Sequence, residues 1–187
     1  MAGGTIFAPH APQTRQRAFR MRPETIIQPV ETAAELDAVR SLCWAYRDFL
    51  MSNTDIDKEI TETFYPVPKY TALMDELPVL HARPKGIMLL ARDGDGTALG
   101  CGMTHALDAE TSEIKRVFVT HAARGMGVAH TLCDALITQA RADGFTRVVL
   151  DTSRALTHAQ RLYARLGFVQ RDAYQPIPNA VLPHLVF

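Results

Sequence analysis

The chain has 187 residues, 47% of them hydrophobic, which is enough for one folded domain with a full core. Its 20 acidic and 20 basic residues balance, which argues against a chain-wide electrostatic attraction to nucleic acid or to a membrane surface. No apolar run approaches the ~20 residues that a membrane-spanning helix needs. The three scattered cysteines predict reduced thiols in a cytoplasmic protein, and no residue pattern predicts a metal site.

The first third of the chain predicts a tail, a strand and a helix. Residues 1–23 are rich in arginine and proline and lack hydrophobic periodicity, so we expect a disordered tail ahead of one domain over residues 24–187. A strand is expected from Thr25 to Val30. Thr32 and Glu35 form a capping-box pattern that begins a helix. The apolar stripe of this helix would face the core, and it consists of Leu36, Val39, Cys43, Tyr46 and Leu50.

The stretch from Ser52 to Leu80 has mixed signals. The prolines in Tyr65-Pro-Val-Pro68 are expected to interrupt regular structure, with a short helix over Tyr70 to Leu77. A hairpin should follow, with strands at Gly86 to Ala91 and Ala98 to His105 around a glycine-rich turn.

The second half alternates strands and helices. Strands are expected over Glu113 to Val119, from Val148, and near Asn179 to Phe187. One helix should run from Gly127 to about Ala142, and another should begin with Thr157 as its N-cap and end at Gly167. This order predicts an α/β fold of the α+β type, with a mixed sheet and helices on both faces.

The most informative segment runs from a short strand, Val117 to Val119, through the turn Arg124-Gly125-Met126-Gly127 into a helix. Free N–H groups and the helix dipole favour an anion at a helix start, and glycine allows the backbone to approach it closely. Arg124 adds a donor for a phosphate oxygen. A dinucleotide fingerprint fits poorly because His130 occupies its third small position, and no P-loop triplet occurs in the chain. The turn therefore predicts a phosphate-bearing cofactor.

A second motif makes this interpretation specific. Arg124-x-x-Gly127-x-Ala129 is followed by Ala159-x-x-Leu162-Tyr163-x-x-x-Gly167-Phe168. In these two motifs the chain resembles the GNAT superfamily of acyl-CoA-dependent N-acyltransferases, over roughly Ile87 to Phe187. It is most similar to a bacterial subgroup with Glu-x-Lys-Arg-x-x-Val before the turn and Leu-Asp-Thr after it, here Glu113 to Val119 and Leu150 to Thr152.

The resemblance implies a single domain whose mixed, largely antiparallel sheet is splayed at its middle, with acetyl-CoA as co-substrate and no metal. The pantetheine arm would pair with the backbone of Val117, Phe118 and Val119. The pyrophosphate would lie on the backbone of the turn and the first helical residues, which are Arg124, Gly125, Met126, Gly127, Val128 and Ala129.

The resemblance also suggests catalytic residues. Tyr163 matches the tyrosine that serves as general acid toward the departing thiolate. Glu113 is a candidate for the base that deprotonates the amine, although many family members carry an acid two positions later, where this chain has Lys115. The alternative is an exposed carboxylate paired with Lys115 or Arg116. His105 and His121 are other titrating candidates.

The acceptor remains open at the level of sequence. It is expected to be a small-molecule or protein amine, and a homodimer is left open. Candidates for the acceptor wall, chosen by location, are Trp44, Arg47, Phe49, Tyr65 and Tyr70. No cysteine lies in either motif, which favours direct attack in a ternary complex. The alternatives are a non-catalytic acyl-CoA sensor and a regulatory module that binds a partner through Ser52 to Leu80.

Overall fold

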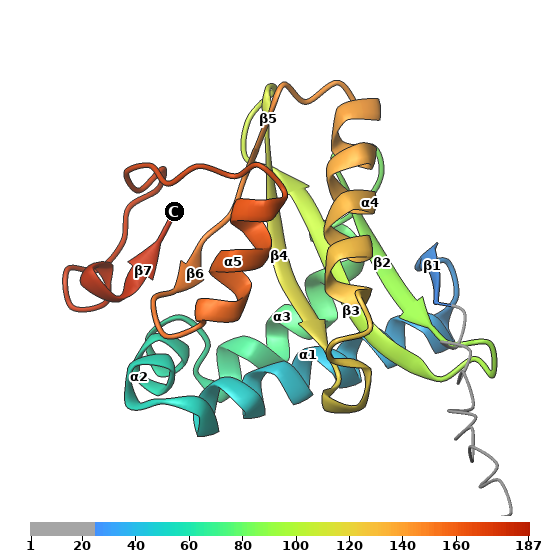
Figure 1. Cartoon of the computed structure of the whole chain (residues 1–187), viewed down its shortest axis with the longest axis horizontal. Helices are drawn as coiled ribbons and strands as arrows, with labels where there is room; N and C mark the ends of the chain where they lie inside the picture. Colours follow the sequence, from blue (N-terminus) through green and yellow to red (C-terminus); the bar gives the residue numbers. More distant parts are fainter. Residues whose placement is uncertain (1–24) are drawn as a thin grey trace, which may run out of the picture.

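The computed structural model describes residues 25–187, so the tail expected over residues 1–23 lies outside the described part of the chain. A five-stranded sheet forms the centre, in the order β1-β2-β3-β4-β5 (Figure 1). Neighbouring strands are antiparallel except for the parallel pair β4–β5. The strands are β1 Ile26–Pro29, β2 Gly86–Arg92, β3 Ala98–Ala106, β4 Thr111–Val119 and β5 Arg147–Val149. A two-stranded sheet pairs β6 Thr152–Ser153 with β7 Leu185–Val186.

Helices cover both faces of the central sheet, as the sequence predicts (Figure 1). Successive side chains of β2 point into two different cores. Met88 and Leu90 pack with α1 and α3, whereas Leu89 packs with α4. Because both faces are covered, β2 is apolar throughout rather than alternating with polar residues. The helices are α1 Ala33–Asn53, α2 Asp55–Phe64, α3 Val67–Leu80, α4 Val128–Ala142 and α5 Thr157–Arg165, with short 3₁₀ turns at His121–Ala123 and Leu182–His184.

A bulge in β4 opens the sheet at its middle. Cys101 pairs with Phe118 but Met103 pairs with Lys115, so Gly102 alone faces two residues of β4, Arg116 and Val117. Arg116 has a φ of 51°, and a side chain on Gly102 would come within 2.9 Å of Leu136 Cδ1. A bulge of this kind bends the strand that carries it. β4 pairs with β5 only over Thr111–Glu113 and then diverges, which confirms the splayed sheet.

The ends of the helices agree with the sequence in two cases and differ in one. Thr32 and Glu35 form the expected capping box at the start of α1. At the end of α5, Gly167 has a φ of 90° and Phe168 N–H donates to the Tyr163 carbonyl, a Schellman ending. The prediction that Thr157 is an N-cap is wrong. Leu156 holds that position because a tight turn, closed by its N–H on the Ser153 carbonyl, starts the helix one residue earlier.

The region from Ser52 to Leu80 is more helical than expected. The interruption expected at Tyr65-Pro-Val-Pro68 is confirmed but is limited to Tyr65 and Pro66, between α2 and α3. Pro66 caps α3 and Pro68 lies in its first turn, where a helix needs no backbone donor. Instead of a short helix, α3 spans 14 residues. The strand expected near Asn179 to Phe187 is reduced to the two residues of β7. Among the described helices, none combines the length and apolarity needed to cross a membrane.

Candidate active site

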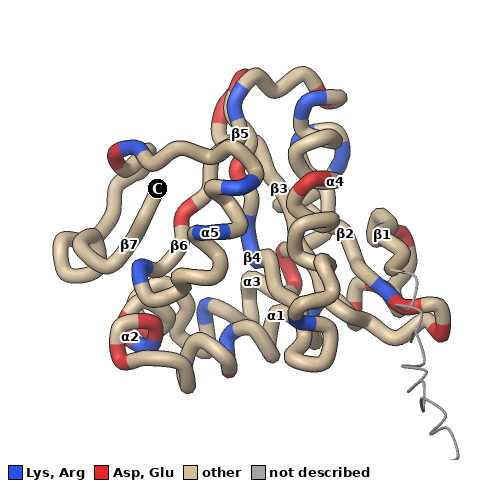
Figure 2. Tube along the Cα trace, in the orientation of Figure 1, with Lys and Arg blue, Asp and Glu red and all other residues tan. Residues whose placement is uncertain are grey.

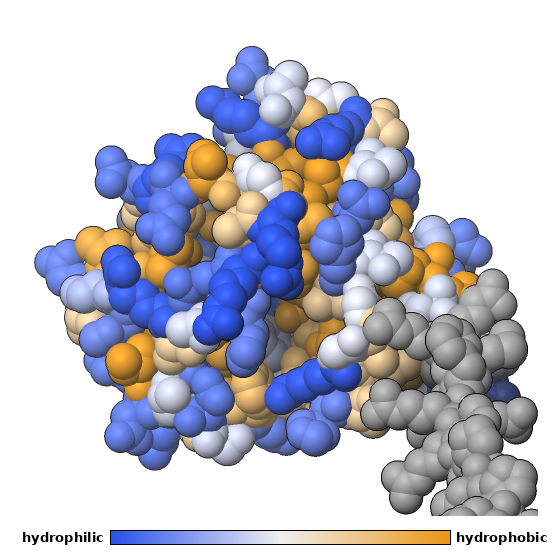
Figure 3. All heavy atoms as spheres, viewed as in Figure 1, coloured by the Kyte–Doolittle hydropathy of each residue, from blue (hydrophilic) through white to orange (hydrophobic). Residues whose placement is uncertain are grey.

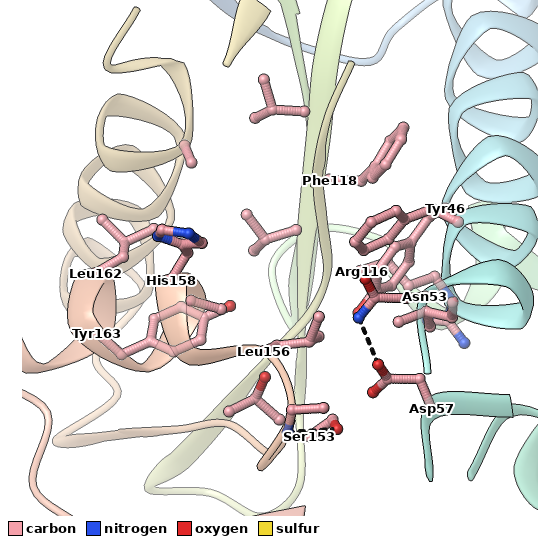
Figure 4. A pocket seen from close by; sticks show the side chains of 18 of the residues that line it. Tyr46, Asn53, Asp57, Arg116, Phe118, Ser153, Leu156, His158, Leu162 and Tyr163 are labelled. Atoms are coloured by element: carbon pink, nitrogen blue, oxygen red, sulfur yellow. Dashed lines mark hydrogen bonds between the residues drawn. The ribbon is translucent and has the colours of Figure 1, made fainter. Parts of the chain in front are cut away.

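One cleft of about 890 Å³ opens where β4 leaves β5. β4 runs between its two flanks, with α4 and α5 on one side and α1 and α2 on the other (Figure 4). In the space-filling view, hydrophilic side chains border the region between α4 and α5, with apolar atoms beneath them (Figure 3). Basic residues lie on α1, β4 and α5, which all border the cleft (Figure 2).

The glycine turn forms one end of this cleft. Gly125 and Gly127 have positive φ angles of 76° and 88°, and a side chain added at either would meet no atom within 4 Å. The N–H groups of Gly125, Gly127, Val128 and Ala129 donate to no backbone carbonyl within residues 25–187. Such free donors at the start of a 15-residue helix provide a positive, open cradle that fits a phosphate group.

Two of the predicted phosphate-binding positions differ from the others. Arg124 N–H donates to the His121 carbonyl and Met126 N–H to the Ala123 carbonyl, so these two donors are used within the turn itself. The Met126 side chain packs against the α4 core. The Arg124 side chain is exposed at the cleft, with its guanidinium carbon 4.8 Å from the centre of the Phe49 ring. It is therefore free to turn toward an anion on the cradle.

The three residues predicted to hold the pantetheine arm, Val117, Phe118 and Val119, all line the cleft. Beyond Glu113, the edge of β4 that faces β5 pairs with no other strand of the described chain. An open strand edge of this kind can pair with the amides of an extended ligand.

Tyr163 reaches the cleft from α5 and faces the space opposite Tyr46 and Phe118 (Figure 4). Its ring lies edge-on to Phe168, 5.9 Å between centres, so the Schellman ending of α5 also orients the tyrosine. Burial, followed by the effect of Cys133, raises the pKa of the Tyr163 hydroxyl well above its usual value. The hydroxyl therefore keeps its proton at neutral pH.

Glu113 lies behind the cleft wall rather than in it. Its side chain is 1% exposed, and it is absent from the residues that line the cleft. Glu113 Oε1 lies 2.6 Å from Lys115 Nζ and accepts a hydrogen bond of 2.5 Å from the Tyr174 hydroxyl, while Oε2 lies 3.2 Å from His105 Nε2. The alternative expected for Glu113 was an exposed carboxylate paired with Lys115 or Arg116. The carboxylate is buried rather than exposed, but it does pair with Lys115.

Lys115 connects Glu113 to the cleft. Its Nζ also donates a 2.6 Å hydrogen bond to Asp151, which lines the cleft. Burial alone would lower the pKa of Lys115, but the charges of Asp151 and Glu113 outweigh it and raise that pKa above its usual value. The lysine is therefore a permanent cation held between two carboxylates.

The acceptor end of the cleft contains expected and unexpected residues. Of the five wall candidates, Arg47, Phe49, Tyr65 and Tyr70 line the cleft, whereas Trp44 packs edge-on to Tyr70 at 5.0 Å between centres. Three further residues that are not among the wall candidates also line the cleft: Tyr46, Asp57 and Arg116. The only sequence signal for Asp57 was its place three residues after Thr54, a capping pattern that says nothing about a cleft.

Within residues 25–187, no cluster of three or more His, Cys, Asp or Glu side chains is arranged to hold a metal.

Comparison with known proteins is consistent with this geometry. Residues 53–168 match the model of the acetyltransferase (GNAT) family. An uncharacterized N-acetyltransferase of Schizosaccharomyces pombe is 34% identical over 172 residues, which cover 88% of this chain and 97% of the relative.

Solved structures share the fold at low sequence identity. A GNAT-family acetyltransferase from Staphylococcus aureus superposes with a TM-score of 0.68 at 15% identity, covering 87% of this chain and 97% of the other. A predicted acetyltransferase from Clostridium acetobutylicum, solved with acetyl-CoA, has a TM-score of 0.59 at 15% identity, covering 83% of this chain and 96% of the other.

Proposed function

Because this chain belongs to the GNAT family of acetyltransferases, we propose that it transfers the acetyl group of acetyl-CoA directly to a primary amine. The observation that carries the proposal is the continuity of the cleft. A single space joins the free donors of the glycine turn to the Tyr163 hydroxyl and to the polar end of the cleft, which residues of α1 and α2 line. A ligand with a phosphate at one end can thus present a reactive group at the other.

In this proposal the chain holds the co-substrate through its backbone. Gly125, Gly127, Val128 and Ala129 donate N–H groups to the pyrophosphate, and Arg124 adds a charge-assisted bond. The edge from Val117 to Val119 pairs with the pantetheine amides. The co-substrate supplies the acetyl thioester.

Tyr163 completes the transfer as a proton donor. The ammonium loses one proton, and the free amine forms a bond to the acetyl carbon. The carbon–sulfur bond breaks, the nitrogen releases its second proton, and the sulfur takes the proton of the Tyr163 hydroxyl, which solvent restores. The net products are an amide, a thiol and one proton. The Tyr163 hydroxyl is protonated at neutral pH, as a proton donor must be when the thiolate departs.

Glu113 assists the loss of the amine proton as a positioning residue, because Lys115 and Asp151 stand between it and the cleft. It holds the Lys115 ammonium against Asp151, and this keeps a carboxylate oriented at the cleft wall. Water beside Asp151 then carries the proton away.

Direct attack is favoured over an acyl-enzyme. No cysteine is among the residues that line the cleft in the described chain, and Cys43, Cys101 and Cys133 are buried elsewhere. The test is a panel of small-molecule and peptide amines with acetyl-CoA, followed by thiol release and by mass spectrometry of the acceptor. Thiol release without an acetylated amine, or a stable acetyl-protein, would contradict the proposal. A protein that binds acetyl-CoA but turns over with no amine would be the sensor alternative.

A further inference from the structure

Two charged side chains at the acceptor end of the cleft lack the partners that buried charges usually have. The first is Asp57, in the first turn of α2 and only 1% exposed. Its Oδ2 accepts hydrogen bonds from Asn53 Nδ2 at 2.6 Å, visible in Figure 4, and from Thr54 Oγ1 at 2.8 Å. Its Oδ1 is buried and has no hydrogen-bond partner within residues 25–187. Capping therefore explains one oxygen of Asp57 and leaves the other without a role.

The second is Arg116, at the bulge of β4. Its guanidinium stacks over the Tyr65 ring, 5.6 Å from the ring centre. Within residues 25–187 its only side-chain hydrogen bond is a weak one, from Nη1 to the sulfur of Met103 at 3.8 Å. Its Nε is buried without a partner, and no carboxylate of the described chain lies within 4.0 Å of the guanidinium. The residue also has a φ of 51°. A non-glycine residue with this backbone conformation is strained, and such strain is concentrated at binding sites.

Both residues line the cleft that holds Tyr163. Asp57 is a buried charge that is incompletely compensated, and Arg116 is half-buried with its Nε fully buried. Such an arrangement is costly unless a ligand supplies the opposite charge. The neighbouring charges limit which class of ligand fits this end of the cleft. Asp151 is already paired with Lys115. Arg47 also lines this end, and among residues 25–187 it donates its Nε only to the Tyr65 carbonyl. Two guanidinium groups without carboxylates thus accompany one free carboxylate oxygen, so a polycation would meet repulsion at this end.

We propose that the acceptor is an amine that also carries a carboxylate, an amino-acid type of substrate. Arg116 binds the carboxylate, and Asp57 Oδ1 accepts a hydrogen bond from the ammonium group. The stacked Tyr65 ring holds the guanidinium in place, so that little side-chain freedom is lost on binding. This inference rests on the proposed acetyl transfer and specifies its substrate class.

The test compares free amino acids with their carboxamides, which keep the amine and remove the negative charge. For the wild-type protein we expect kcat/KM to be at least about tenfold higher for the acid than for its amide. Arg116→Gln should lower kcat/KM for the acid by about ten- to a hundredfold, mainly through KM, and bring the acid-to-amide ratio close to one. Asp57→Asn should weaken both substrates and leave the ratio intact.

Arg92→Gln is the matched control. Arg92 lies on β2, and its buried Nε, like that of Arg116, has no hydrogen-bond partner in the described part of the chain. Arg92 does not line the cleft, so its loss should change the kinetics of neither substrate. CoA affinity and melting temperature of each variant report folding. If Arg116→Gln does not fold, Arg116→Lys, which keeps the charge but not the planar guanidinium with its paired donors, should give an intermediate ratio.

Two results would overturn the inference without contradicting the proposed acetyl transfer. The first is a wild-type protein that uses acid and amide equally, and the second is an acid-to-amide ratio that is unchanged in the Arg116 variant. Absence of transfer to every amine would instead overturn the proposed function.

Discussion

Tyr163 and Glu113 show how burial gives two ionisable side chains different capabilities. The Tyr163 hydroxyl is desolvated but lies in the cleft, so burial preserves a proton that the cleft can use. The Glu113 carboxylate is buried outside the cleft and surrounded by Lys115, Tyr174 and His105, so its charge acts on those neighbours first. The first residue can act on a ligand directly, and the second acts through an ion-paired chain.

Tyr163→Phe keeps the ring and its contact with Phe168 but removes the proton. We expect kcat to fall by about 10²–10⁴-fold with little change in CoA affinity, because the lost proton transfer matters mainly in the transition state. Steady-state kinetics with an active amine, together with calorimetry for CoA, measures both effects. Tyr46→Phe is the control on the opposite wall, and a large loss of kcat there with a normal Tyr163 variant would reassign the acid.

Glu113→Gln should slow turnover most at neutral pH. The defect should shrink as the pH rises toward the pKa of the amine, near ~10.4 for a lysine side chain, because free amine then forms unaided. The measurement is the pH–rate profile of the variant against the wild type. Glu110→Gln removes an exposed carboxylate paired with Arg147 and should leave the profile unchanged. A Glu113 defect of equal size at every pH would show a purely structural carboxylate.

At the scale of elements, two backbone features create the site. The glycine turn leaves donors free at the start of α4, and the bulge at Arg116 directs β4 away from β5. The bulge also places Lys115 and Arg116 on the same side of the sheet: Lys115 contacts Glu113, and Arg116 stacks on Tyr65. Regular alternation would have sent them to opposite faces. One extra residue therefore both opens the cleft and supplies it with charge.

Gly127→Ala should weaken CoA binding by about tenfold or more. An alanine at this φ is strained by about 1–2 kcal/mol, and its methyl group would occupy the open space where the phosphate approaches. Calorimetry gives the affinity and thermal melting gives the stability. Gly96→Ala is the matched control, since Gly96 has a φ of 83° and open space around it, but lies in the β2–β3 hairpin. We expect both variants to lose similar stability, and only the Gly127 variant to lose CoA affinity. If the CoA affinity of the Gly127 variant is unchanged, the turn has a purely structural role.

At the scale of the whole molecule, the sheet separates two apolar cores, and several polar side chains are buried beside them. One of these is His81, at the end of α3, which is 3% exposed. Its Nδ1 lies 2.8 Å from the Thr104 carbonyl, and its Nε2 is buried without a partner in the described chain. Burial lowers the pKa of His81 to about 4. The folded protein therefore resists protonation at a position where the unfolded chain accepts a proton.

This difference predicts a pH dependence of stability. Below the unfolded pKa of ~6.5 the unfolded chain binds the proton first, so the free energy of unfolding should decrease as the pH falls toward 4. Between pH 7 and 4.5 the contribution of His81 is about 2–3 kcal/mol. His81→Asn, which retains a donor for Thr104 but cannot titrate, should lose less stability over this interval. Urea unfolding at both pH values measures the difference, and parallel losses in variant and wild type would rule out His81 as the source.

The sequence alone determined the features that depend on local chemistry. The capping box at Thr32, the glycine turn at Gly127 and the Schellman ending at Gly167 are each fixed by a few neighbouring residues and their backbone preferences. Together with the motif around Tyr163, they were sufficient to predict the fold class and the family. The start of α5 was missed by one residue, because a turn closed by Ser153 competes with the capping preference of Thr157.

Only the tertiary structure decided what depends on distance through space. Glu113 became a buried, paired carboxylate because His105, Lys115 and Tyr174 converge on it, the last from 61 residues away. Asp57 entered the cleft because α2 packs against α1 and reaches β6, although its local sequence indicates only a helix cap. The physical reason is that burial and charge pairing are set by which distant segments pack together, whereas turns and caps are set by adjacent residues.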